Sequence, residues 1–234
     1  MRRTPIGEAD WMLQLFTPRL GLLSAAARSA RRASSKLGVL EPLHGLEVEL
    51  DLAPGDEVAR LVQSKILRPR LGILTDGLRL DEAARILRWV RATVGAGAPE
   101  PRGFAIVVEA LDRLDLGGEP RPIVLRAGLE LLSALGYALE LERCTSCGRA
   151  CPEGVAVLVD PAAGGVVCRA CGGGPLRLGA SVRLELCTIA RGGESGYPAE
   201  VLEFGARLVD EALSAHAARG ERRGPMGQGG RDRR

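Results

Sequence analysis

The chain has 234 residues, of which 46% are hydrophobic and 26% are charged, and its formal net charge is +3 at neutral pH. This length allows one large domain or two modest ones, and the hydrophobic fraction is sufficient for a packed core. No run of about eighteen apolar residues occurs, so we expect no membrane span.

The positive charge is concentrated at the start of the chain. The first forty residues hold seven basic residues against two acidic ones, a larger excess than that of the whole protein. A local excess of this kind indicates a surface that binds an anionic partner. The basic residues are Arg2, Arg3, Arg19, Arg28, Arg31, Arg32 and Lys36.

The first seventy residues carry the short, alternating pattern of β-strands. We expect strands over 11–17, 21–26 and 43–52, and a return strand from Val58 after a turn at Pro54-Gly55-Asp56. The polar segment 27–37 is expected to be an exposed loop. Several short strands in about sixty residues enclose a core only if they curl into a small barrel.

Beyond residue 70 the apolar residues recur at helical spacing. We expect helices over 83–94, 104–114, 122–135, 181–190 and 200–217. Pro122 is expected in the first turn of the third helix and Gly136 just after its end. From Arg219 the chain is rich in glycine and arginine without an apolar anchor, which predicts a disordered basic tail over 219–234.

Two C-x-x-C motifs give the strongest chemical signal in the chain. They are CTSC at 144–147 and CRAC at 168–171, and each is followed by a glycine that suits a tight turn. Four thiolates at this spacing are typical of a tetrahedral Zn²⁺ site. We therefore predict one structural zinc ion per chain, held by Cys144, Cys147, Cys168 and Cys171.

Other interpretations of the six cysteines are weaker. Two disulfides are disfavoured because no secretory signal precedes the motifs, which predicts a reducing cytoplasm. Cys151 could replace Cys147 as a ligand, although the matched spacing favours Cys147. Cys187 lies in an apolar run and is expected to be a small buried hydrophobe.

Catalysis finds little support. The chain has two histidines, His44 and His216, far apart in sequence, and no phosphate-binding loop of the P-loop type. A zinc deaminase would need an open metal position and a glutamate two residues after its first ligand, and neither is present. We expect a protein that is not an enzyme.

Three patches of sequence resemble the RecO family of bacterial DNA repair proteins. They are RTPIGEAD at 3–10 followed by LFT at 15–17 and LG at 20–21; ARSARR at 27–32 followed by LEP at 40–42; and LGY at 135–137 leading through Leu141 to CTSCG at 144–148. Members of this family usually have several residues before the RTP motif, so we expect the true start to lie upstream of Met1.

The resemblance implies an α+β protein. An OB-fold, a small β-barrel that binds nucleic acid, is expected over 1–72, and a helical domain over 73–218 carrying the zinc module at 144–171. It implies a cytoplasmic, nucleoid-associated mediator that binds single- and double-stranded DNA. Such a protein anneals complementary strands coated with single-strand-binding protein and acts with RecR to load RecA at gaps.

Arginines on a loop suit phosphates, which a guanidinium binds bidentately. We predict that the DNA-binding residues are Arg3, Arg19, Arg28, Arg31, Arg32 and Lys36. Trp11 and Phe16 are expected in the core and not as stacking platforms, which predicts binding without sequence preference. The alternatives are an ordinary solvated loop and a zinc-ribbon adaptor that binds a protein instead of DNA.

Overall fold

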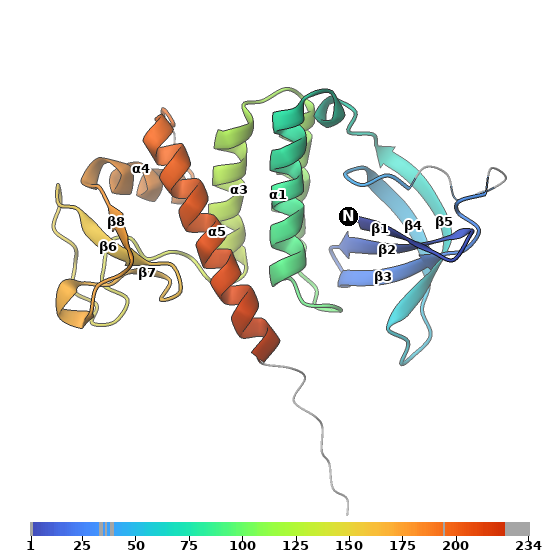
Figure 1. The fold of residues 1–234 in the computed structure, drawn as a ribbon, viewed down its shortest axis with the longest axis horizontal. Helices are drawn as coiled ribbons and strands as arrows, with labels where there is room; N and C mark the ends of the chain where they lie inside the picture. Colours follow the sequence, from blue (N-terminus) through green and yellow to red (C-terminus); the bar gives the residue numbers. More distant parts are fainter. Residues whose placement is uncertain (1, 33–34, 36, 38–39, 194, 223–234) are drawn as a thin grey trace, which may run out of the picture.

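The computed structural model describes residues 2–32, 35, 37, 40–193 and 195–222, with the backbone alone for 219–222. Three parts follow one another along the molecule (Figure 1): a five-stranded sheet, a group of helices and a small three-stranded sheet that carries the paired cysteines. The predicted α+β class is confirmed.

The larger sheet has the strand order β1-β2-β3-β5-β4, in which β3 and β5 are parallel and the other pairs are antiparallel. This is the order of an OB-fold. No ladder joins β1 to β4 in the described residues, so the predicted barrel is not closed. β1 has only five residues, and an ion pair between Arg3 and Glu41 (2.6 Å) links it to the segment before β4. The strands are β1 (Arg2–Ile6), β2 (Asp10–Thr17), β3 (Gly21–Ala27), β4 (Gly45–Asp51) and β5 (Val58–Arg68).

A small core lies within this sheet. Alternate residues of β5 are buried, with Ala59 and Leu61 inside and Arg60 outside, as the period of a strand requires. Ala27 ends β3 and is buried, and Leu37 is buried as well, so the prediction of an exposed loop over 27–37 is wrong at both ends. Leu37 packs with the strands because an apolar side chain in this polar segment gains by leaving water.

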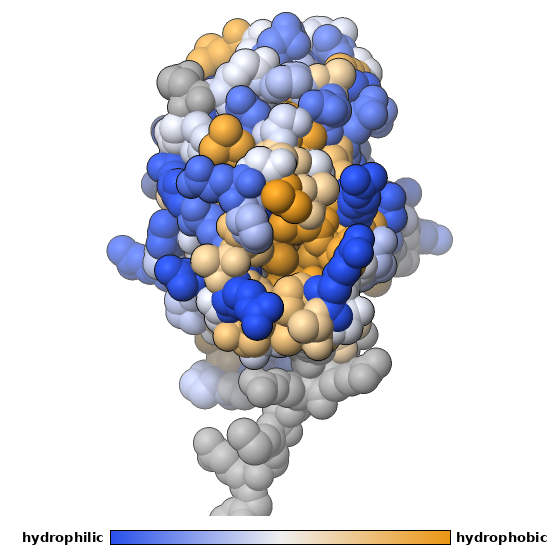
Figure 2. Space-filling model, turned by 90° about the vertical axis from the view of Figure 1, so that its left-hand side faces the viewer, coloured by the Kyte–Doolittle hydropathy of each residue, from blue (hydrophilic) through white to orange (hydrophobic). Residues whose placement is uncertain are grey.

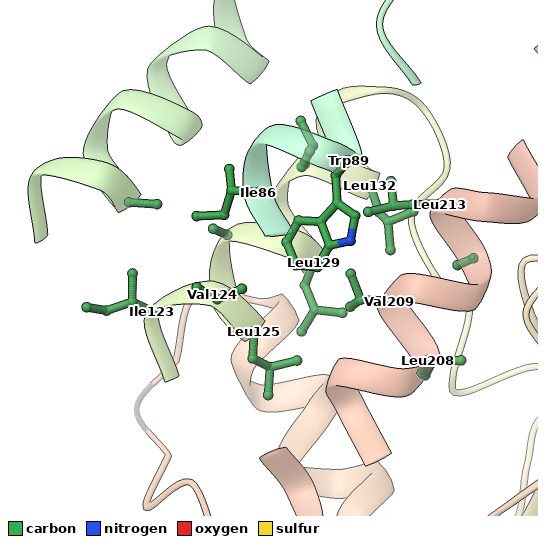
Figure 3. Packing of buried hydrophobic residues seen from close by; sticks show 14 of the residues in the cluster. Ile86, Trp89, Ile123, Val124, Leu125, Leu129, Leu132, Leu208, Val209 and Leu213 are labelled. Atoms are coloured by element: carbon green, nitrogen blue, oxygen red, sulfur yellow. The ribbon is translucent and has the colours of Figure 1, made fainter. Parts of the chain in front are cut away.

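The helices form the main core. Their buried stripes match the predicted periodicity, and Figure 3 shows Trp89 of α1 packed among side chains of α3 and α5. Gly136 has a φ of +81° after α3, as predicted. α3 starts at Pro120, two residues before the predicted start, and Pro122 lies in its first turn as predicted. The helices are α1 (Gly77–Thr93), α2 (Pro101–Asp115), α3 (Pro120–Ala134), α4 (Ala180–Ala190) and α5 (Ala199–Arg222).

The predicted tail starts too early, because α5 continues through Arg222. Residues 223–234 lie outside the described part of the chain, and so does Lys36. Among the described residues, no helix has the length and the apolar character needed to cross a membrane.

Gly128 of α3 lies where α1 and α5 pack tightly against it. A Cβ atom there would lie 2.6 Å from Val209 Cγ1 and 3.1 Å from two ring atoms of Trp89. We expect Gly128→Ala to lower the free energy of unfolding by about 1–3 kcal/mol, because overpacking outweighs the gain in helix propensity. Denaturant unfolding measures this. Gly77→Ala is the control, since nothing lies within 4 Å of its Cβ position; equal stability of the two variants would contradict the close packing.

Residues 144–178, here called the cysteine module, lie between α3 and α4. Three short strands, β6 (Val157–Asp160), β7 (Gly165–Val166) and β8 (Leu176–Leu178), form its antiparallel sheet. Sequence patterning did not predict these strands because they have two to four residues each. Their buried side chains, Val159, Val166 and Leu178, join the main core and attach the module to the helices.

A buried ion pair joins the larger sheet to the helices. The side chain of Arg70, only 4% exposed, follows β5 and reaches Asp112 of α2 at 2.7 Å. Its guanidinium also donates to the carbonyl oxygen of Leu43 (2.7 Å). Phe16 packs edge-to-face on Phe104 across the same junction, with ring centroids 5.4 Å apart.

Candidate nucleic-acid interface and metal centre

Residues 28–32, here called the basic turn, follow β3 directly. Ser29 has a φ of +54°, and its N–H donates to Asp10 Oδ1 (2.7 Å). The N–H of Arg31 donates to the carbonyl oxygen of Ala9 (2.9 Å). These bonds fix the turn against the start of β2. Arg28 and Arg32 are exposed and take part in none of the ion pairs found among the described residues.

Trp11 lies between two of the predicted DNA-binding arginines. The guanidinium carbons of Arg3 and Arg31 lie 4.9 Å and 5.4 Å from the centroid of its ring. The ring is half-buried against the small core, which matches the expectation that it is not a free platform. The sequence analysis did not predict this cluster. Pro5 of β1 pairs with Trp11 of β2, so Arg3 lies on β1 two residues before the partner of Trp11.

The structure separates the five predicted residues that it describes, which leave out Lys36. Arg3 and Arg31 meet at Trp11, but the charge of Arg3 is offset by its ion pair with Glu41. Arg19 is exposed in the turn before β3, whereas the basic turn follows that strand. Seven residues of strand place Arg19 about 20 Å from Arg28. Arg19 is therefore not part of the cluster at the basic turn.

Further arginines lie on α1 close to β1. The pKa of Arg91 is lowered first by burial and then by the positive charges of Arg2 and Arg88, so these three cations are neighbours. Arg88 and Arg2 are exposed. The arginines of α1 repeat on the polar side of the helix, but the sequence alone does not indicate that Arg2 approaches them.

Four of the six cysteines gather at one point of the cysteine module. The sulfur atoms of Cys144, Cys147, Cys168 and Cys171 all lie within 4.8 Å of one another, and those of Cys147 and Cys168 are 3.9 Å apart. A zinc ion with Zn–S bonds of about 2.3 Å places its sulfurs about 3.8 Å apart, so the geometry fits a tetrahedral metal site. All six cysteines are free thiols.

Backbone turns hold the four sulfurs. Gly148 and Gly172 have φ values of +72° and +107°, which is the left-handed backbone expected after each motif. The N–H of Gly148 donates to the carbonyl oxygen of Cys144 (2.8 Å), and that of Gly173 to Cys168 (3.0 Å). Each pair of thiols therefore points to one side of its turn.

The cluster also favours a cation electrostatically. The N–H of Cys168, and next that of Cys147, donate to Cys144 Sγ and lower the pKa of this thiol to about 6. The hydrogen bond with Cys168 comes first among the causes that raise the pKa of Cys171 to about 12. Four thiolates this close repel one another, so all of them ionise together only around a metal ion.

Cys151 does not join the cluster within the described residues. Burial raises the pKa of Cys151, and burial likewise raises that of Cys187, which packs against the main core as expected. Neither thiol resembles a metal-binding thiolate.

Comparison with known proteins matches both halves of the chain. Residues 1–70 match the family described as recombination protein O N terminal, and residues 74–223 match recombination protein O C terminal. A protein of Geobacter sulfurreducens named DNA repair protein RecO is 34% identical over 216 residues, which cover 91% of this chain and 88% of the relative.

Two more relatives carry the same name. The protein of Rubrobacter xylanophilus is 35% identical over 73% of this chain and 68% of its own length, and that of Anaeromyxobacter sp. is 33% identical over 92% and 86%. Since the two family models and these relatives span both the sheet and the helices, this chain belongs to the recombination protein O (RecO) family.

Proposed function

We propose that this protein is a non-enzymatic mediator of DNA repair and recombination. It binds single- and double-stranded DNA, anneals complementary strands and helps RecR load RecA on gaps coated with single-strand-binding protein. Family membership supports the class of function. The observation that carries the DNA contact is the basic turn, which presents the exposed guanidiniums of Arg28 and Arg32 at one end of the sheet.

The proposed contact is with phosphates. One guanidinium can bind two oxygens of a phosphate group. Arg3 and Arg31 lie close to the ring of Trp11 and strengthen the positive field around it. Arg2, Arg88 and Arg91 extend this field onto α1. A surface that contacts phosphates and few bases binds DNA of any sequence, as an annealing protein must. We assign the main phosphate contact to 1–72, with the arginines of α1 beside it.

We propose that the four clustered cysteines hold one structural Zn²⁺. A closed shell of four thiolates leaves no position for substrate water, so the ion stabilises the cysteine module and takes no part in chemistry. The proposed location, the bacterial cytoplasm at the nucleoid, is a reducing compartment in which such thiolates persist.

Changing Arg28, Arg31, Arg32 and Lys36 together to alanine is expected to weaken binding of single-stranded oligonucleotides and to abolish annealing of strands coated with single-strand-binding protein. The slope of log affinity against log salt should become shallower by about 0.7 for each phosphate that the variant no longer neutralises. Fluorescence anisotropy at several salt concentrations measures the slope, and a gel assay measures annealing.

A variant with the same decrease in charge elsewhere serves as the control. Arg102, Arg113, Arg121 and Arg177 are exposed and lie outside the basic turn. Their replacement by alanine should leave most of the affinity and annealing in place. Equal decreases in the two variants would show that net charge, and not the basic turn, controls binding.

A protein-binding adaptor without annealing activity is the second candidate, because the end of the molecule opposite the sheet is partly apolar. Figure 2 shows apolar side chains gathered in a hollow on this end, which is formed by the cysteine module and α4. On these elements Leu184 is 69% exposed and Val155 is 50% exposed. Mobility shift with short oligonucleotides at low salt separates the candidates, since an adaptor would leave them unshifted.

A further inference from the structure

A pocket lies where the end of α3, the first cysteine turn and α5 meet. Its volume is about 460 Å³, within the range of small-ligand sites. Tyr137, Glu140, Arg143, Thr145, Gly164 and His216 are among its lining residues. The pocket is open, and its lining combines charged, small and aromatic residues.

The aromatic part of this lining is rigid. Tyr137 stacks on His216 with ring centroids 3.8 Å apart and an angle of 8° between the planes. His216 is buried and covers one face of Tyr137, while Tyr137 itself is 38% exposed and lines the pocket. Part of the tyrosine side chain is therefore open to a ligand in the pocket.

The end of α3 fixes the position of this tyrosine. The N–H of Tyr137 donates to the carbonyl oxygen of Leu132 (2.7 Å), and the N–H of Gly136 donates to that of Ser133 (3.1 Å). These two bonds form a Schellman motif, which ends the helix and holds the residue after the glycine in one orientation. The tyrosine backbone is already ordered, so little conformational entropy is lost when a flat group stacks on the ring.

The charges around the ring select the kind of ligand. Arg143 is exposed on the pocket wall and belongs to none of the ion pairs found in the described part of the chain. Its guanidinium repels a cationic side chain and attracts an anion. Oε1 of Glu140 accepts the N–H groups of Glu142 (2.8 Å) and Arg143 (3.0 Å), which fixes this acid at the wall.

A planar ring joined to an anion fits this arrangement. We propose that Tyr137, supported by His216, stacks an unpaired base of single-stranded DNA, while Arg143 contacts the adjoining phosphate. This rests on the proposed function, since the ligand is a DNA strand. The junction of α3, the first cysteine turn and α5 thus carries a base-stacking site, in addition to the phosphate-binding basic turn.

The test uses the full-length protein and an oligothymidylate with one 2-aminopurine, whose fluorescence falls when it stacks on an aromatic ring. Tyr137→Leu keeps an apolar contact with His216 but offers no π face. We expect it to abolish the quenching and to weaken binding between about fivefold and a hundredfold, the range for one stacked base. Its salt slope should equal that of the wild type, because the same phosphates are neutralised. Tyr137→Phe should restore both quenching and affinity.

Each outcome separates this site from the basic turn. Wild-type quenching and affinity in Tyr137→Leu, with its fold verified by thermal unfolding, would overturn the stacking site and leave the proposed function in place. A wild-type protein that binds no oligonucleotide at low salt would overturn both. Equal affinity for the free 2-aminopurine nucleotide and for the oligonucleotide would overturn the assignment to a DNA strand.

Discussion

A protein with both Cys144 and Cys147 replaced by serine is expected to be purified without metal, whereas the wild type is expected to carry one zinc ion per chain. Two ligands cannot hold the ion in a closed shell, and the energy of metal binding is the folding energy of a small module of this kind. We expect the cysteine module to unfold and the melting temperature to fall by on the order of 10 °C, with reduced solubility. Elemental analysis and thermal unfolding measure both effects.

Two single variants provide the controls for this result. Cys151→Ser and Cys187→Ser each remove a thiol that lies outside the cluster, so both proteins should keep the metal ion and their stability. Absence of the metal from Cys151→Ser would show that Cys151 is a ligand. A double variant of Cys144 and Cys147 that is free of zinc, fully folded and as stable as the wild type would refute a structural role for the ion.

Asp112→Ala is expected to lower the free energy of unfolding by about 1–3 kcal/mol, because it leaves the buried guanidinium of Arg70 without its carboxylate partner, which is itself 28% exposed. Nε of Arg70 donates to Asp112 Oδ1 (2.8 Å), and the exposed Arg68 contacts the same carboxylate. The remaining bond from Arg70 to the carbonyl oxygen of Leu43 satisfies one donor but not the charge. Denaturant unfolding gives the free energy.

Asp51→Ala is the matched control. It breaks the ion pair with Arg60 (2.7 Å), in which both side chains are 59% exposed. An exposed pair of this kind contributes less than about 1 kcal/mol. If Asp112→Ala were no less stable than Asp51→Ala, the junction between sheet and helices would not depend on the buried pair.

The helices were predictable because their signals are local. A stripe such as Ile86, Leu87 and Val90 repeats at helical spacing within one segment, and all three residues are buried. The open seam between β1 and β4 depends on pairing between distant segments, which no local pattern encodes. The burial of Leu37 likewise depends on strands that arrive from elsewhere in the chain.

The candidate sites show the same contrast between local signals, which could be predicted, and contacts between distant segments, which could not. The spacing of each C-x-x-C motif places its two thiols in one tight turn, so the cluster of four sulfurs could be expected from the sequence. The contact of Arg31 with Trp11 and the separation of Arg19 from the basic turn arise from strand register. The stacking of Tyr137 on His216 joins residues on either side of the cysteine module, and no local pattern in the sequence relates them.

The insertion of the cysteine module between α3 and α4 in the sequence has a consequence for the order of folding. α5 packs against α1 and α3, yet the module separates it from them in sequence. The chain between Ala134 and Ala199 must therefore close into a loop before the core is complete, and the entropic cost of closure grows with the length of flexible chain. The proposed ion would shorten that flexible length by gathering Cys144 and Cys171 early. We therefore expect metal supply to act on the rate at which the newly made chain matures, in addition to the stability of the finished protein.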